Sequence, residues 1–289
     1  MHLQNNRFKH FSYCLRFGGV LILTALIAGL GGILLHEFLD LIEYLVFGHG
    51  ETSTTQAVSS KQFILVVLAG IISAILWYFL QRKNRQIISV KSQMQAENPA
   101  SKMPKLWIHL TNIFLQVASV GAGSPIGKEG APRELGALGA GRVSDYLKLT
   151  LQDRKLAIAC GASAGLAAVY QVPVASIFFA FETLGLGISV LNLISVSVTT
   201  ILASIVAGVV ISDAPLYETA QVTLDVKTTL LAMFLVVLIS PIAQLFRRLT
   251  QKAQAQKTTD HTILWRLPLT FLLLASLSLI FPEILGNGG

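Results

Sequence analysis

Residues 121–141 read GAGSPIGKEGAPRELGALGAG, a stretch much richer in glycine than the apolar runs on either side of it. Pro125 and Pro132 flank its GKEG core at 127–130, and proline is favoured in the first turn of a helix. Glycines leave backbone N–H groups open to a ligand, and the N-terminal end of a helix attracts anions. The stretch therefore predicts a helix start that can bind an anion.

Long apolar runs surround this stretch. The chain has 289 residues, of which 53% are hydrophobic and 13% charged, whereas a soluble domain carries roughly 25% charged residues. Five runs are each close to the ~20 residues that cross the hydrocarbon layer as a helix. They are residues 17–38, 63–80, 190–211, 230–246 and 264–285. The composition predicts an all-α, polytopic integral membrane protein of the cell membrane.

The positive charge is unevenly distributed among the connecting segments. Lys and Arg gather in residues 1–16, 81–105 and 247–257, while 39–62 and 212–221 carry mainly acidic residues. Such alternation is what the positive-inside rule produces. We therefore expect a cytoplasmic N-terminus at 1–16 and contact with a lipid bilayer, with no nucleic acid as partner.

The GKEG stretch is too polar and too rich in glycine for a lipid-facing helix. Irregular backbone at membrane depth is tolerated where protein encloses it or where it lines an aqueous cavity, and broken helices often build substrate sites. The carboxylate of Glu129 could occupy the anion site and leave it on protonation, as a gate. A second interpretation is that Glu129 pairs with Lys128 or Arg133 in a polar loop outside the membrane.

A second informative stretch, residues 160–182, reads CGASAGLAAVYQVPVASIFFAFE. Its small residues at 161–165 allow close helix contact, and Pro173 predicts two short helices, at 155–170 and 174–184. Glu182 ends the apolar run, where a structural role near an aqueous face is expected.

The two stretches together resemble the CLC family of chloride channels and chloride/proton antiporters. GKEGAPRELGALGAGR is similar to the family's G-[RK]-E-G-P signature, and residues 160–182 are similar to its alanine-rich helix pair. The resemblance implies short, broken helices in inverted repeats, a homodimer with one pore in each subunit, and chloride as the transported ion. It makes Glu129 the gating residue, with the backbone of Gly127, Lys128 and Gly130 facing the anion.

Three positions depart from the family pattern. Residues 86–91, QIISVK, replace the G-S-G-I-P loop that supplies an anion-binding serine, and Ser89 is the candidate substitute. Ala131 stands where the signature has proline. Thr183 stands where proton-coupled exchangers carry an acid, which favours a channel or an uncoupled or differently coupled transporter, although another acid could carry protons.

Residues 17–289 resemble the first repeat of the family and the linker to its second repeat, so we expect a pathway that is incomplete within this chain. Chloride passage is the leading hypothesis. The alternatives are a truncated, non-conducting half and a secondary transporter of fluoride, nitrate or an organic anion. No His or Asp is placed to activate a Ser or Cys, and no metal-binding spacing is present. The sequence therefore predicts a protein that is not an enzyme and has no cofactor.

Overall fold

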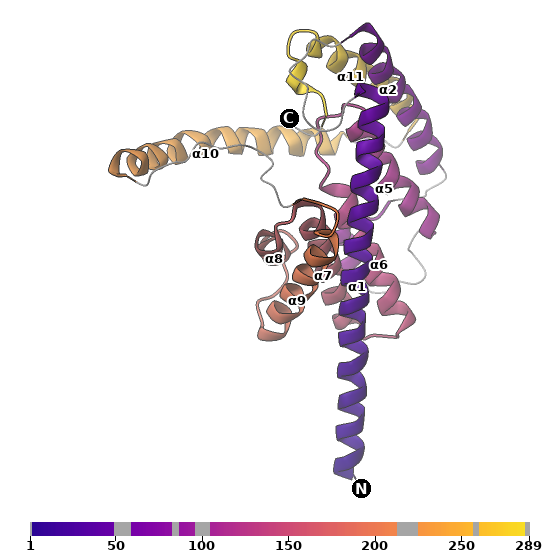
Figure 1. The fold of residues 1–289 in the computed structure, drawn as a ribbon, viewed down its shortest axis with the longest axis vertical. Helices are drawn as coiled ribbons and strands as arrows, with labels where there is room; N and C mark the ends of the chain where they lie inside the picture. The colour runs from indigo at the N-terminus through magenta and orange to yellow at the C-terminus, as the bar shows by residue number, and fades with distance from the viewer. Residues whose placement is uncertain are drawn as a thin grey trace. The chain divides into compact units, whose positions relative to one another are not determined.

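The computed structural model describes residues 2–48, 59–82, 87–95, 105–212, 225–256 and 260–286, with side chains from residue 13 onward. Every regular element in these ranges is a helix, which confirms the predicted all-α class (Figure 1). The chain divides into two compact units. One consists of Met1–Asp213 with Ile263–Gly289, and the other of Ala214–Thr262.

The larger unit begins with two long apolar helices. α1 runs from His2 to Phe47 and contains the predicted first span, and α2 runs from Ser60 to Gln81. α2 starts at a reciprocal cap. The backbone N–H of Gln62 donates to Ser59 Oγ at 3.3 Å, and the backbone N–H of Ser59 donates to Gln62 Oε1 at 2.8 Å. The cap supplies partners for N–H groups that a helix start leaves unpaired.

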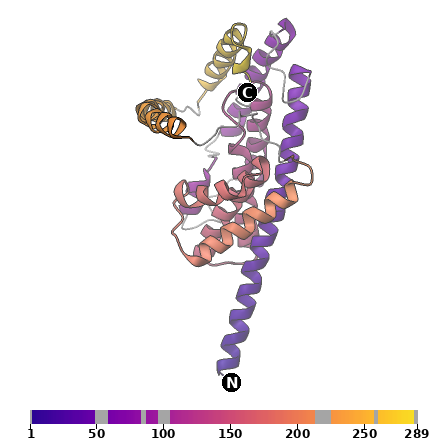
Figure 2. The ribbon, with the colours of Figure 1, turned by 60° about the vertical axis from the view of Figure 1, so that its left-hand side comes forward.

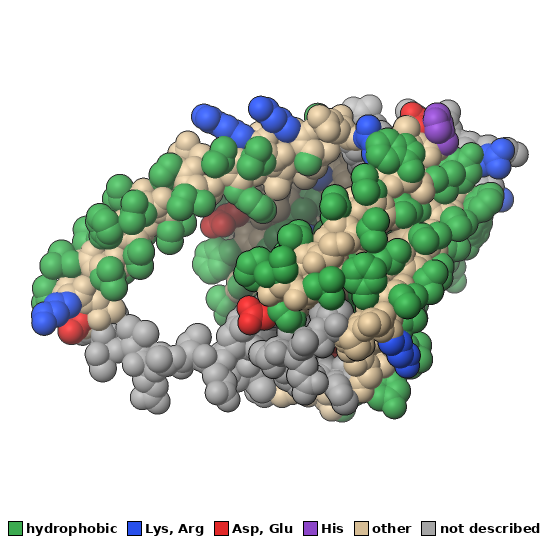
Figure 3. Space-filling view, turned by 90° about the horizontal axis from the view of Figure 1, so that it is seen from above, with side chains coloured by type: hydrophobic (Ala, Val, Ile, Leu, Met, Phe, Trp, Pro, Cys, Tyr) green, Lys and Arg blue, Asp and Glu red, His purple; other side chains and the backbone are tan. Residues whose placement is uncertain are grey.

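Within the described ranges, four helices are long and apolar enough to cross a membrane. They are Tyr13–Phe47, Ser60–Gln81, Val190–Ala207 and Val226–Ala255. Hydrophobic side chains lie along the outer surfaces of the helices in Figure 3, where they outnumber the charged side chains. Soluble monomers rarely leave so many large apolar side chains exposed along helices of this length, so the helices are those of a multi-pass membrane protein.

The centre of the larger unit is built from α5 (Leu106–Gly121), α6 (Gly130–Tyr146) and α7 (Leu151–Tyr170). α6 and α7 approach so closely that a Cβ atom at Gly136 would collide with the carbonyl oxygen of Gly161. The same holds at Gly165, where the Pro132 carbonyl oxygen occupies the position of the missing Cβ. The predicted close helix contact at 161–165 is therefore confirmed, and it fixes α6 against a helix that is buried over most of its length.

α8 (Pro173–Glu182) follows α7 after a sharp change of direction. Gln171 ends α7 with a left-handed backbone, at φ 53°, and Pro173 is the first residue of α8. Proline suits the first helical position because it has no N–H to leave unpaired. The predicted division at Pro173 is confirmed, although α7 begins earlier than the expected residue 155. Thr150 caps α7 by accepting the backbone N–H of Asp153 at 3.2 Å.

α9 (Val190–Ala207) lies beside α1, as Figure 2 shows. Gly29 of α1 leaves room for Val206 of α9, and alanines from both helices form a buried apolar cluster there. α9 is shorter than the predicted 190–211 because Gly208 follows its last residue. Glycine costs more backbone entropy in a helix than other residues and commonly stands at helix ends.

α11 (Ile263–Ser278) packs against α2, where the ring of Phe271 lies against Gly70. The predicted span at 264–285 is too long, since the helix ends at Ser278 and a short 3-10 helix follows at Pro282–Ile284. Proline disfavours helical backbone in the residue before it and cannot donate a helical hydrogen bond, so an uninterrupted helix through 282 is unfavourable.

The smaller unit contains α10 (Val226–Ala255), a 30-residue helix with no buried side chain. Asp225 caps it by accepting the backbone N–H of Thr228 at 2.7 Å. Its apolar N-terminal part contains the predicted run 230–246, and Arg247, Arg248 and Lys252 follow in its last turns. Basic side chains are favourable at a helix C-terminus because they oppose the helix dipole.

Candidate functional site

The backbone between α5 and α6 is irregular, as the sequence predicts. α5 ends at Gly121, and two glycines of the connection take positive φ values, 109° at Gly123 and 76° at Gly127. The carbonyl of Gly123 accepts the backbone N–H of Gly286 at 3.0 Å, which ties the connection to the segment after α11. α6 then begins at Gly130, so the predicted helix start in the GKEG core is confirmed.

Glu129 is the residue immediately before α6 and is half-buried. Its carboxylate folds back onto Gly127, in the position that a Cβ at residue 127 would take. Within the part of the chain that the structure describes, no hydrogen bond or ion pair holds this carboxylate. The Glu129 side chain can therefore move without breaking a hydrogen bond or ion pair to the described residues.

Arg133 does not pair with the Glu129 carboxylate. Its Nε donates to the backbone carbonyl of Glu129 at 2.8 Å, and its guanidinium lies 5.4 Å from the centre of the Phe179 ring. The first of these contacts binds the last carbonyl before the helix, and the second is a cation–π contact with α8. Arg133 thus fixes the backbone of the helix start and leaves the Glu129 side chain out of its contacts.

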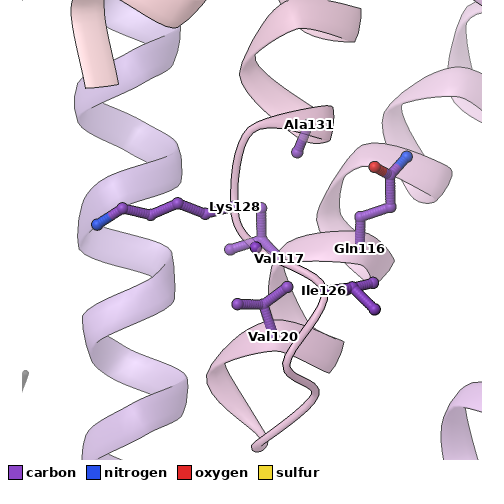
Figure 4. Close-up of a pocket in the computed structure, with 7 residues that line it drawn as sticks. Gln116, Val117, Val120, Ile126, Lys128 and Ala131 are labelled. Atoms are coloured by element: carbon purple, nitrogen blue, oxygen red, sulfur yellow. The ribbon is translucent and has the colours of Figure 1, made fainter. Parts of the chain in front are cut away.

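A small pocket lies beside the helix start. Its lining residues come from α5, from the connection and from the first turn of α6: Gln116, Val117, Val120, Ile126, Gly127, Lys128 and Ala131 (Figure 4). The side chain of Lys128 extends away from the other pocket residues. It is 6% exposed, and its Nζ lies 5.8 Å from the centre of the Tyr170 ring. Lys128 therefore offers the pocket its backbone, with its ammonium group directed elsewhere.

Glu134 is the centre of a buried polar cluster one turn further along α6. Its Oε1 lies 3.0 Å from Nδ1 of His109, and its Oε2 accepts from Asn112 Nδ2 and Gln116 Nε2, both at 2.9 Å. Asn112 Oδ1 in turn accepts the indole N–H of Trp77 at 3.1 Å. Gln116 belongs to this cluster and also lines the pocket, so the two sites are adjacent.

The Glu134 cluster was not predicted from the sequence. The available signal is the spacing of His109, Asn112 and Gln116 along one helix, since residues three, four and seven apart share a face. The partner of this polar face is Glu134, which lies five residues after Glu129 in the sequence.

Ser89 and Thr183 lie in other parts of the larger unit. Ser89 is exposed and precedes the short helix α3 (Val90–Gln95), where its Oγ lies 2.9 Å from Ser92 Oγ and accepts the Ser92 N–H. Thr183 is exposed at the end of α8, next to the exposed Glu182. Neither residue belongs to the lining of the pocket at the start of α6.

Broken helices that meet at a small-residue core, an irregular connection between α5 and α6, and several membrane-length helices define a polytopic membrane protein of the broken-helix type. The sequence model of the voltage-gated chloride channel family matches residues 69–289. The chain belongs to this family, whose members transport anions across membranes as channels or chloride/proton antiporters and are not enzymes.

Individual relatives agree with this assignment. The voltage-gated ClC-type chloride channel ClcB of Escherichia coli O17:K52:H18 (strain UMN026 / ExPEC) is 28% identical over 259 residues. The ClcB protein of Escherichia coli strain K12 / DH10B has the same identity over the same length. Both matches cover 86% of this chain and 61% of the relative. The chain therefore spans about three fifths of the length of these curated relatives.

The fold is also found among solved structures. The crystal structure of a slow cyanobacterial Cl⁻/H⁺ antiporter superposes with a TM-score of 0.67 at 17% sequence identity, covering 91% of this chain and 64% of that one. At this identity the likeness concerns the fold. It confirms the predicted helical architecture.

Proposed function

We propose that this chain forms an anion pathway for chloride in which Glu129 is the gate. The observation that supports the proposal most directly is the position of the Glu129 carboxylate, which lies against Gly127 and beside the first turn of α6 without a partner among the described residues. A free helix start carries unpaired N–H donors and the positive end of the helix dipole, both of which favour an anion. A carboxylate and a chloride ion compete for such a position.

Protonation supplies the gating step. An ionised Glu129 carboxylate occupies the positive helix end, while the protonated acid loses its electrostatic attraction to that end and no longer competes with chloride. The backbone of Gly127, Lys128 and Gly130 would then face the anion, and Ser89 would be a second ligand if its loop approaches the pathway. Thr183 cannot carry a proton as an acid does, so proton coupling through that position is not part of the proposal.

The test is anion efflux from liposomes that contain the reconstituted protein, measured as a function of pH. We expect Glu129→Gln and Glu129→Ala to remove most of the pH dependence, because neither side chain ionises. Glu37→Gln is the matched control, since Glu37 is an exposed acid on α1. Unchanged flux and unchanged pH response in both Glu129 variants would rule out Glu129 as the gate.

Ion choice is tested by competition. Chloride efflux in the presence of fluoride, nitrate or a carboxylate distinguishes a chloride pathway from a transporter of another anion. A second candidate function is a membrane scaffold that does not conduct by itself. It predicts no efflux from the chain alone and restored efflux when segments matching the rest of a relative are added.

Assembly and orientation are further proposals. The family resemblance suggests a homodimer, and the distribution of Lys and Arg suggests that residues 1–16 face the cytoplasm. Cross-linking in membranes tests the first, and protease protection of an N-terminal tag tests the second.

A further inference from the structure

The polar cluster around Glu134 has a hydrogen-bond pattern that fixes the position of one exchangeable proton. The indole N–H of Trp77 can only donate, so the Asn112 atom that faces it at 3.1 Å is the oxygen, and the Asn112 amide nitrogen faces Glu134. Glu134 Oε2 thereby accepts N–H groups from both Asn112 and Gln116. A proton on this carboxyl group must therefore reside on Oε1, which faces Nδ1 of His109 at 3.0 Å.

The pair is buried within the helical core. His109 has no exposed surface, and Glu134 is 8% exposed. His109 Nε2 is buried and has no hydrogen-bond partner among the described residues. The hydrogen bonds from Asn112 and Gln116 stabilise an ionised Glu134. One additional proton, shared across the 3.0 Å between His109 Nδ1 and Glu134 Oε1, would remove the net charge of the pair from surroundings in which a charge is costly.

The other helices around α6 leave His109 as the titratable partner. α1 meets α6 where Leu135 lies against Gly31, and α3 meets it through apolar side chains. α7 meets it through the Gly136–Gly161 backbone contact and, near the end of α6, through the ion pair of Arg154 with Asp145. The charged neighbours along the chain are Arg133, which binds the Glu129 carbonyl, and Glu129 itself, whose carboxylate lies against Gly127. The three hydrogen-bond partners of Glu134 among the described residues all come from α5.

We propose that His109 and Glu134 form an intramembrane proton-binding site, distinct from Glu129, that takes up one proton as a pair. In the unloaded state Nδ1–H donates to an ionised Oε1. A proton that adds to the Nε2 lone pair gives an imidazolium, and transfer of the Nδ1 proton to Oε1 gives a neutral carboxylic acid beside a neutral imidazole. One proton is gained and no other group changes charge.

Gln116 connects this site with the pocket. Its Nε2 donates to Glu134, while its Oε1 lies 2.7 Å from the position of a Cβ at Gly130, the first residue of α6. A change in the charge of Glu134 alters the strength of the hydrogen bond from Gln116 and thereby the packing on Gly130. This connection rests on the proposed anion pathway, whereas the proton site itself does not.

The proton site is tested by infrared and imidazole ¹⁵N NMR titration of the full chain in lipid. We expect a protonated-carboxyl band and the His109 ring signals to change together with pH, as coupled groups do. Glu134→Gln should remove the band component that changes together with the His109 signals, His109→Gln should abolish the pH dependence of that component, and Glu37→Gln should leave it unchanged. If Glu134→Gln does not fold, Glu134→Asp should shift the band. Survival of that component in Glu134→Gln, or His109 signals that do not change with it, would overturn the site.

The connection through Gln116 has its own measurement. Chloride should shift the pH at which the Glu134 band changes in the unmodified chain and should have no such effect in Gln116→Ala. A wild-type titration that is insensitive to chloride overturns the connection. Failure of the Glu129 gate appears only in the efflux assay, so the two failures are distinguishable.

Discussion

The carboxylate of Glu129 lies directly against the α-carbon of Gly127, in the space that a side chain at residue 127 would fill. The backbone at Gly127 has a φ of 76°, a conformation that residues other than glycine rarely adopt. Two requirements for glycine therefore coincide at one residue, and they can be separated by substitution.

Gly127→Ala should displace the Glu129 carboxylate and also strain the backbone. We expect a loss of about 1–2 kcal/mol of stability from the left-handed backbone, together with a severalfold rise in anion efflux and a weaker pH dependence. Thermal unfolding in detergent and liposome efflux measure the two effects.

Gly185→Ala is the matched control for this substitution. Gly185 has a φ of 71°, and no atom lies within 4 Å of its added Cβ. It should show the same loss of stability with unchanged efflux. Equal efflux in the two variants would mean that the Glu129 position does not control anion passage.

Gly130→Ala should disturb Gln116, whose Oε1 lies 2.7 Å from the added Cβ. Overpacking of this kind costs about 1–3 kcal/mol, and it should weaken the hydrogen bond from Gln116 to Glu134. The double variant Gly130→Ala/Gln116→Ala lacks the collision. Its loss of unfolding free energy should therefore differ from the sum of the two single-variant losses by about 0.5–3 kcal/mol. Strictly additive losses would show that the two residues are not in contact in the folded protein.

The sequence was sufficient for the helix start at Gly130 and the division at Pro173 because glycine and proline act on the local backbone. The Glu134 cluster could not be predicted in the same way. Its members come from α2, α5 and α6, and their meeting depends on how these helices pack. A polar face at 109, 112 and 116 is visible in the sequence, but its partner is determined by tertiary structure.

The ends of apolar runs were also less predictable than their existence. Hydrophobicity continues beyond Ser278 and Ala207, whereas the helices end there because Pro282 and Gly208 alter the backbone locally. A hydropathy pattern reports which residues avoid water and does not report hydrogen bonding. The helix boundaries could therefore be determined only from the structure.

Acid should weaken the start of α10. The side chain and backbone N–H of Thr228 hydrogen-bond to the Asp225 carboxylate and hold its pKa below the ordinary value. Because the folded pKa is the lower one, the contribution of this cap is complete above the unfolded pKa and is lost as the pH falls through the folded pKa. Amide hydrogen exchange at Thr228 should accelerate in that range relative to its intrinsic rate. Asp225→Asn keeps an acceptor that does not titrate, so an identical pH response in this variant would contradict the assignment.

Gly136→Ala should be the most destabilising of these glycine substitutions, because the added Cβ meets the backbone carbonyl of Gly161 and backbone cannot rotate away. We expect a loss of about 3 kcal/mol, at the upper end for overpacking, and a lower midpoint of thermal unfolding.

At Gly139 the obstructing group is the side chain of Ile27, which can change rotamer, so Gly139→Ala should cost less. Gly18 lies in α1 with no atom within 4 Å of its added Cβ, and Gly18→Ala should stabilise the protein by about 0.5–1 kcal/mol through helix propensity. If Gly136→Ala unfolds at the same temperature as Gly18→Ala, α6 and α7 are not in backbone contact, and the start of α6 is not held by α7 in the way described.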